Sequence, residues 1–277
     1  MSIVKKEKLF NKETLVRILS ALALIGIACV SMFLPSRIFF LFLILPLSIL
    51  TSREWVGLCF PKWSKEKKDT VTGIAIVIAM YFVWAKSWPG YEKIVLNCAV
   101  IAILTNLVYF QLLNKDIKPF FNKSDSKIKV KIYIIGVFLS GFITQVAAWK
   151  STMMLHEGGN MDLWFFLVLV SVADSAGYVF GKYIASPANI FTMSPNKTWS
   201  GTAAMLIMPA VVGLVLPERM ALWSLVLGGV ALIGDLWVSL IKRLSGQKDT
   251  GSIIPGHGGL LDRLDSHIMA LSILGFY

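Results

Sequence analysis

The residues best suited to chemistry lie near the end of the 277-residue chain, in the segment KRLSGQKDTGSIIPGHGGLLDRLDS at residues 242–266. Five glycines in this segment let backbone N–H groups approach an anion closely. Its cations include Lys248 and Arg263, its carboxylates are Asp249, Asp262 and Asp265, and His257 stands between glycines. Oxygen ligands without sulfur suit Mg²⁺ and not zinc. The segment predicts a site for phosphate and a hard metal ion, with His257 either a phosphate or proton partner or a structural hydrogen-bonding residue.

The helix expected before this segment carries a polar stripe. Its members Asp235, Ser239, Lys242 and Arg243 are spaced i, i+4, i+7 and i+8. An acid deep in an apolar helix, with two cations at the helix end, indicates a polar site. Helix geometry directs Lys242 along the Asp235 line and Arg243 about 80° away from it. Alternatively, the two cations anchor the helix at the membrane surface and Asp235 packs in the core.

A second acid lies at a similar depth in another expected helix. Asp174, Tyr178 and Gly181 share one face of that helix. Gly177 and Gly181 also form a GxxxG pattern, which is typical of closely packed helices. A charge inside a membrane span is a candidate functional group, so Asp174 needs a cation or a hydrogen-bond partner.

The final expected helix carries a third polar face. Asp262, Asp265 and Ser266 are spaced i, i+3 and i+4. They would share a face if that helix begins near Leu261. Such a face would present two carboxylates and a hydroxyl together.

The loop MSPNKTWSG at residues 193–201 precedes another apolar stretch. Pro195 stops helix extension, and Lys197 is a point charge suited to phosphate. Ser200 is predicted to cap the helix that follows. By itself the loop is also consistent with a plain connector.

Composition indicates the elements that must position these residues. The chain is 56% hydrophobic and only 16% charged, with a mean hydropathy of +0.70. Soluble domains are roughly 45–50% apolar and about 25% charged, so we predict an all-α polytopic membrane protein. About nine transmembrane helices are expected, at residues 16–34, 37–52, 70–88, 93–113, 130–149, 161–182, 201–217, 220–241 and 265–277. Three cysteines far apart exclude a disulfide scaffold and a cysteine-based zinc site.

The basic residues orient these spans. Of the 27 Lys and Arg residues, 22 fall on the side of the N-terminal tail and 5 on the other side. Because cytoplasmic loops carry the excess, the N-terminus is predicted to be cytoplasmic. We divide the chain into a tail at 1–15, five spans at 16–149, and a catalytic region of four spans at 150–277 with the signature loop 239–265. Arg53–Phe60 is interpreted as an interfacial turn anchored by Trp55 and Trp63.

The C-terminal segment resembles the phosphatidate cytidylyltransferases, also called CDP-diacylglycerol synthases. The pattern S-x-x-K-R, then K-D, then H-G-G-x-x-D-R-x-D is present without a break at Ser239, Lys242, Arg243, Lys248, Asp249, His257, Gly258, Gly259, Asp262, Arg263 and Asp265. SPNKT at residues 194–198 resembles another family motif, as does the Asp174, Tyr178, Gly181 spacing. The chain departs from the family at Ser200, where glutamate is usual, and at Ala176-Gly177, where Gly-Ala is frequent.

The resemblance implies transfer of the cytidylyl group of CTP to phosphatidic acid, giving CDP-diacylglycerol and pyrophosphate. The implied catalytic residues are Asp235, Lys242, Arg243, Asp249 and Asp262. The implied substrate-binding residues are Ser239, Lys197, Ser194, Thr198, Lys248, His257, Gly258, Gly259 and Arg263. The implied ligands of one or two Mg²⁺ ions are Asp235, Asp262, Asp265 and Asp174, with a monovalent ion left open. We assign Lys242 to CTP and Arg243 to the lipid phosphate or the following loop.

The expected partners are CTP, phosphatidic acid and the lipid bilayer, without nucleic acid, and a homodimer is left open. A multi-pass protein with a cytoplasmic site is expected, in the inner or plasma membrane if the source is bacterial. The first alternative is a CTP-dependent transferase or kinase acting on an isoprenoid-type lipid. The second is a transporter, in which Asp174 and Asp235 would line an ion pathway. Against it, the sequence has no inverted repeat and its polar groups cluster on one side.

Overall fold

A computed structural model describes residues 26, 29–30, 32–84, 91–113, 128–184, 186–187, 191–215, 218–254 and 258–274. The described residues fold into helices without a β-strand, and isolated bridge residues are found only at Thr198 and at the pair Ile254 and Gly258. The helices are α2 (Ser36–Phe39), η1 (Phe40–Ile44), α3 (Leu45–Cys59), α4 (Lys65–Trp84), α5 (Tyr91–Leu113), α6 (Ile128–Gly158), α7 (Asn160–Tyr183), α8 (Trp199–Gly213), α9 (Glu218–Ser245) and α10 (Leu261–Leu274). The all-α prediction is confirmed for the described residues.

Four helical stretches of the described residues are long and apolar enough to cross a membrane. They are Ser36–Cys59, Ile128–Gly158, Met161–Tyr183 and Trp223–Ser245. Leu96–Leu112 and Trp199–Gly213 are apolar but shorter. These helices identify an integral membrane protein. The count of nine spans is not confirmed, and the expected span at 16–34 lies mostly outside the described residues.

One continuous helical stretch replaces the predicted span at 37–52 and the interfacial turn that was expected to follow it. It runs through Ser36–Cys59, with a π-helical turn at Phe40–Ile44 just before Pro46, which lacks an N–H. The interpretation of Arg53–Phe60 as a turn is therefore wrong. Trp55 is also no surface anchor, because it is 2% exposed and its Nε1 donates to the Phe138 carbonyl at 3.0 Å.

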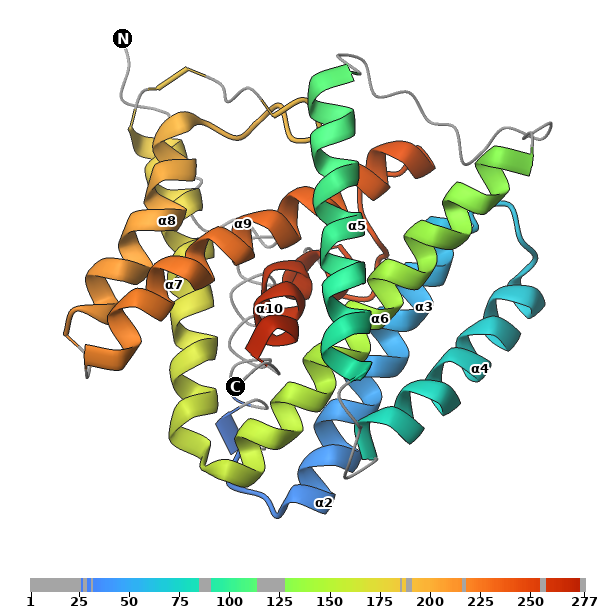
Figure 1. The fold of residues 1–277 in the computed structure, drawn as a ribbon, viewed down its shortest axis with the longest axis horizontal. Helices are drawn as coiled ribbons and strands as arrows, with labels where there is room; N and C mark the ends of the chain where they lie inside the picture. The colour runs from blue at the N-terminus through green and yellow to red at the C-terminus, as the bar shows by residue number, and fades with distance from the viewer. Residues whose placement is uncertain are drawn as a thin grey trace, which may run out of the picture.

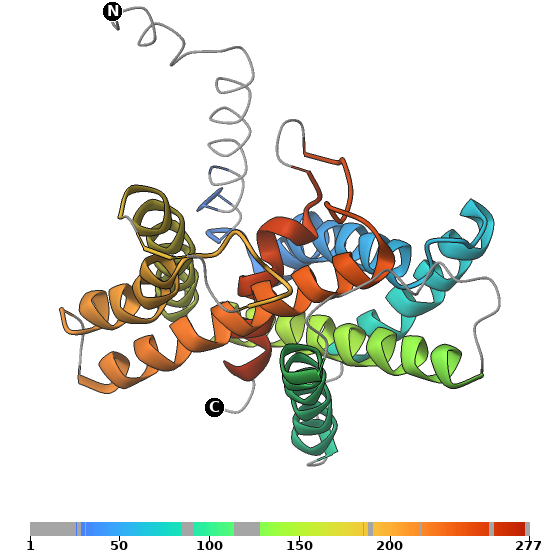
Figure 2. The ribbon, with the colours of Figure 1, turned by 90° about the horizontal axis from the view of Figure 1, so that it is seen from above.

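Helix α10 lies near the middle of the ribbon in both views (Figures 1 and 2), with α7 and α8 on one side and α3 and α4 on the other. It contacts α6, α9, α7 and α3. Most of its residues are buried, among them Ile268 and Met269. The helix predicted to carry catalytic carboxylates is thus held by neighbours from both halves of the chain.

Candidate active site

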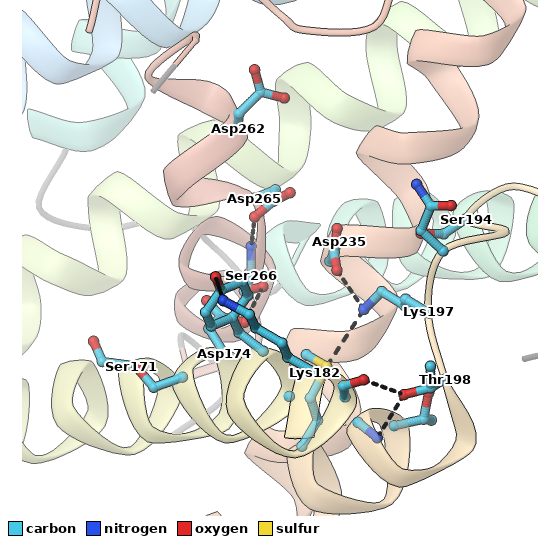
Figure 3. A pocket seen from close by; sticks show the side chains of 18 of the residues that line it. Ser171, Asp174, Lys182, Ser194, Lys197, Thr198, Asp235, Asp262, Asp265 and Ser266 are labelled. Atoms are coloured by element: carbon cyan, nitrogen blue, oxygen red, sulfur yellow. Dashed lines mark hydrogen bonds and ion pairs between the residues drawn. The ribbon is translucent and has the colours of Figure 1, made fainter. Parts of the chain in front are cut away.

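A cavity of about 790 Å³ opens between α7, α8, α9 and α10, with the loop before α8 along one side. This volume is within the range of small-molecule sites, roughly 300–1,000 Å³. Its polar lining includes Asp174, Ser194, Lys197, Thr198, Asp235, Asp262, Arg263 and Asp265 from the predicted site, together with Ser171, Lys182, Asn196, Ser266 and His267. Four segments distant in sequence are therefore brought to one polar cavity, as Figure 3 shows for ten of these residues.

Lys197 contacts the carboxylate of Asp235 on α9. Its Nζ forms an ion pair with Asp235 Oδ2 and also contacts the Met205 sulfur (Figure 3). The other oxygen of Asp235, Oδ1, accepts a 3.4 Å hydrogen bond from Ser239 one turn along α9. The loop at 191–198 is therefore more than a plain connector, because it delivers a charged side chain to the acid of the polar stripe.

The predicted polar face of α10 is confirmed. The helix begins at Leu261, and Asp262, Asp265 and Ser266 all line the cavity. Ser266 Oγ donates to Asp174 Oδ1 at 2.9 Å, so the half-buried acid of α7 has the hydrogen-bond partner that its sequence context required (Figure 3). This bond joins α7 to α10 across the cavity.

Three of the carboxylates that line this cavity, Asp174, Asp235 and Asp265, come from three different helices. Asp265 lies within electrostatic range of both Asp174 and Asp235. Asp265 Oδ1 accepts only from the backbone N–H of Ser266, and its Oδ2 accepts no hydrogen bond from the described residues. Like charges at close range repel one another, and a cation would offset that repulsion. The donor chemistry of these three acids therefore fits a hard cation.

The described residues do not form a complete set of metal ligands. No three Asp, Glu, His or Cys side chains among them surround one point as metal ligands. Both oxygens of Asp262, like those of Asp235, already contact protein donors, but the donors of Asp262 include two backbone N–H groups. Lys242 Nζ lies 2.7 Å from its Oδ1, and Oδ2 accepts from the backbone N–H groups of Thr250 and Gly259 at 2.8 and 3.1 Å.

A second carboxylate organises the same segment, and no motif in the sequence predicted a role for it. Glu54 of α3 is 5% exposed. Its oxygens accept from Leu260 N at 2.9 Å, from Leu261 N at 2.7 Å and from Thr250 Oγ1 at 2.8 Å. Its signal in the sequence is a single acid beside Arg53 at the end of an apolar helix, which is a functional candidate by default.

The glycines of the signature segment leave the space that these two carboxylates and their partners occupy. A Cβ on Gly259 would lie 1.9 Å from Thr250 Oγ1 and 2.7 Å from Glu54 Oε2, and one on Gly251 would lie 2.6 Å from Glu54 Oε1. In the described residues, the backbone of the signature segment therefore lies against carboxylates of the protein itself. Gly246, at φ 75°, ends α9, where Gln247 N bonds Lys242 O and Gly246 N bonds Arg243 O. This pattern is a Schellman motif.

The other predicted site residues that the structure describes do not line the cavity. Arg243, Lys248 and Asp249 have exposed side chains and do not line it. Ser239 and Lys242 also lie outside the lining, although each contacts a carboxylate that belongs to it. Gly258, at φ 87°, adopts a backbone conformation that favours glycine. His257 lies outside the described residues.

The start of α8 corrects one prediction. Thr198, and not Ser200, caps the helix, because its Oγ1 accepts from Gly201 N at 3.3 Å. Ser200 Oγ instead contacts the carbonyls of Phe180 and Ile184 at the end of α7, both at 3.2 Å. Ser200 therefore ties two helices together.

Close packing explains the GxxxG glycines of α7. A Cβ on Gly201 of α8 would lie 2.6 Å from the Gly177 carbonyl and 3.1 Å from Gly181 Cα. The packing interpretation of Gly177 and Gly181 is confirmed. It brings α8 against α7 beside Asp174, and both glycines line the cavity.

Fold and cavity together define a helical membrane protein whose polar site is built mainly from its second half. The profile of the Cytidylyltransferase family matches residues 15–277, so the chain belongs to that family. Among its relatives is a phosphatidate cytidylyltransferase of Staphylococcus saprophyticus subsp. saprophyticus, 39% identical over 127 residues, which are 43% of this chain and 48% of the relative.

Two further relatives carry the same name. The phosphatidate cytidylyltransferase of Brucella suis biovar 1 is 37% identical over 149 residues, 50% of this chain and 54% of the relative. That of Mycobacterium leprae is 32% identical over 137 residues, 47% of this chain and 44% of the relative. The chain thus spans about half the length of these relatives.

Proposed function

We propose that this protein transfers the cytidylyl group of CTP to phosphatidic acid, giving CDP-diacylglycerol and pyrophosphate. The observation that carries the proposal is the cavity in which Lys197 reaches Asp235 while Asp174 and Asp265 approach from two other helices. Membership in the family and the names of the relatives support the same reaction.

The reaction joins two anions. An oxygen of the lipid phosphate attacks the α-phosphorus of CTP, a new P–O bond forms, and the bond to the β-phosphate breaks as pyrophosphate leaves. The attacking phosphate is already ionised at neutral pH, so no strong general base is needed. The protein must instead offset charge and align the reacting groups.

The cavity offers cations for this task. Lys182, Lys197 and Arg263 line it, and Lys182 is exposed at the end of α7, beside the rings of Tyr178 and Tyr183. We assign Lys197 and Arg263, with Ser194 and Thr198, to substrate phosphates. Arg243 and Lys248 are assigned to the lipid phosphate or pyrophosphate, since both side chains are exposed near the end of α9.

The proposed cofactor is Mg²⁺, as one or two ions. Asp174, Asp235 and Asp265 would hold it, with Asp262 a further carboxylate next to them. A bound Mg²⁺ would neutralise the triphosphate and stabilise the charge that develops on the leaving group. Lys197 would hold Asp235 in place until substrate phosphate competes for its ammonium group.

The N-terminal side of the membrane is proposed to be cytoplasmic, on the Lys and Arg asymmetry. CTP would then reach the cavity from the cytosol and the lipid would enter from the surrounding leaflet. Nine spans remain part of this proposal, and a homodimer stays open.

The deciding experiment measures incorporation of radiolabelled CTP into lipid by the purified protein in detergent with phosphatidic acid, with and without Mg²⁺. We expect labelled CDP-diacylglycerol and equimolar pyrophosphate only when the metal is present. Product formed from polyprenyl phosphate or an isoprenoid alcohol, and not from phosphatidic acid, would replace the proposed substrate. No nucleotide-dependent product with any of these lipids would reject the enzyme assignment.

A further inference from the structure

The end of α3 and the signature segment meet through one buried side chain. Glu54 lies 196 residues before Thr250 in sequence, yet its carboxylate accepts from the Thr250 hydroxyl and from two backbone N–H groups of the segment. Leu260 and Leu261 supply those N–H groups at the first turn of α10. A helix start normally leaves its first N–H groups without partners, and the positive end of the helix dipole favours an anion there.

The backbone N–H groups at the start of α10 donate to two different carboxylates. Asp262 Oδ2 takes the N–H of Gly259, and Glu54 takes the next two N–H groups. Thr250 bridges them, because its Oγ1 lies 2.8 Å from Glu54 Oε2 and 3.1 Å from Asp262 Oδ2. One hydroxyl proton serves both acids, so the position of Asp262 depends on where Glu54 holds Thr250.

Glu54 does not line the cavity, whereas Asp262 and Arg263 do. We infer that Glu54 is a positioning residue, whose carboxylate sets the signature segment and the first turn of α10 so that Asp262 and Arg263 face the cavity. It acts through Thr250, Leu260 and Leu261 and touches no reacting group. The inference concerns the proposed cytidylyl transfer and rests on it only for the kinetic part of the test.

The surroundings of Glu54 leave little freedom for replacement. Gly251 and Gly259 would each place a Cβ within 2.7 Å of its oxygens. The neighbouring residue, Trp55, is fully packed against Gly141 of α6 and fixes the helix that carries Glu54. The packing around Glu54 therefore accommodates a carboxylate in only one position.

The test compares Glu54→Gln with Glu66→Gln. The glutamine keeps the shape of the side chain, but its NH₂ group cannot accept from a backbone N–H. Glu66 is an exposed acid in the first turn of α4, so its variant removes the same charge away from the segment. Hydrogen exchange at the amides of Leu260 and Leu261 should rise at least tenfold in Glu54→Gln and stay unchanged in Glu66→Gln.

Kinetics supply the second readout. Glu54→Gln should lower kcat at least tenfold and change the KM for CTP less than threefold, since the substrate contacts remain while the geometry around Asp262 is lost. A KM effect without a kcat effect would overturn the positioning role. If the wild-type protein shows no cytidylyl transfer, the proposed function fails, yet the exchange measurement still decides the role of Glu54.

Thr250 provides an independent variant should Glu54→Gln fail to fold. Thr250→Val removes the bridging hydroxyl and should raise exchange at Leu260 and Leu261, while Thr250→Ser should recover most of the lost protection. Wild-type exchange in both Glu54→Gln and Thr250→Val would overturn the inference.

Discussion

Lys242 Nζ lies 2.7 Å from Asp262 Oδ1, and this ion pair joins the end of α9 to the start of α10. The two side chains are only 16% and 9% exposed. Lys242 was predicted to continue the stripe of Asp235 toward CTP, but in the structure it holds a carboxylate of the next helix. The first and last parts of the signature are thus linked directly, and Lys242 acts on the cavity through Asp262.

Removing either partner of this ion pair should destabilise the protein. Lys242→Met and Asp262→Asn should each lower the free energy of unfolding by about 3–5 kcal/mol, because each leaves a partly buried charge or donor without its partner. The double variant should lose less than the sum, with a coupling of about 0.5–3 kcal/mol. Denaturant unfolding of the four proteins in detergent measures this cycle.

A surface pair provides the control. Arg53 and Asp69 lie 3.4 Å apart with side chains 52% and 47% exposed. Their cycle should give a coupling of about 0–1 kcal/mol, since solvent screens exposed charges. Equal coupling energies in both pairs would mean that the contact of Lys242 with Asp262 stabilises the protein no more than an exposed ion pair does.

Ser200→Ala should affect stability more than catalysis. The hydroxyl ties the start of α8 to the carbonyls of Phe180 and Ile184, so its loss should cost about 1 kcal/mol of unfolding free energy. Turnover should stay within threefold of wild type. Thr105→Ala on α5 is the control, because the Thr105 hydroxyl bonds only to its own helix. A hundredfold fall in kcat would show instead that Ser200 takes the place of the family's usual glutamate in catalysis.

Local spacing predicted those parts of the site that lie on one helix. The shared face of Asp262, Asp265 and Ser266 follows from the helix period once Leu261 begins the helix, and this was confirmed. The need of Asp174 for a partner was also predictable, because an acid inside an apolar helix must be satisfied. That Ser266 is the partner depends on how α7 packs against α10, which periodicity does not encode.

The role of Glu54 could not be predicted in the same way. Its partners come from a segment about two hundred residues later, and the glycines of that segment are also typical of phosphate loops. Only the packing of α3 against α10 distinguishes an internal carboxylate from a bound phosphate. The helix ends were uncertain for a similar reason, since α3 continues through residues that local composition assigned to the membrane surface.

Gly259→Ala should disrupt the signature segment. The added Cβ would lie 1.9 Å from Thr250 Oγ1 and 2.7 Å from the Gly251 backbone nitrogen, so the segment must shift. We expect a loss of about 1–3 kcal/mol in unfolding free energy and a fall in turnover, measured by thermal unfolding and by CTP incorporation. Gly136→Ala on α6 meets nothing within 4 Å and should be neutral or slightly stabilising. Wild-type behaviour of Gly259→Ala would contradict the packing of Glu54 and Thr250 around this glycine.

The carboxylates of the cavity should separate into two groups by their response to Mg²⁺. Asp235→Asn should abolish turnover and leave the fold intact, because it removes a proposed ligand and the partner of Lys197 without opening the core. Asp265→Asn should raise the Mg²⁺ concentration for half-maximal activity at least tenfold, since one of its oxygens accepts no hydrogen bond from the described residues. Asp262→Asn should instead lower kcat and stability with little change in the Mg²⁺ dependence, because Lys242 and the backbone N–H groups of Thr250 and Gly259 already hold its two oxygens. Asp162→Asn, at an exposed acid in the first turn of α7, serves as the control. Near-normal activity of Asp235→Asn at low Mg²⁺, or the same Mg²⁺ dependence in Asp265→Asn and Asp162→Asn, would show that the metal is held elsewhere.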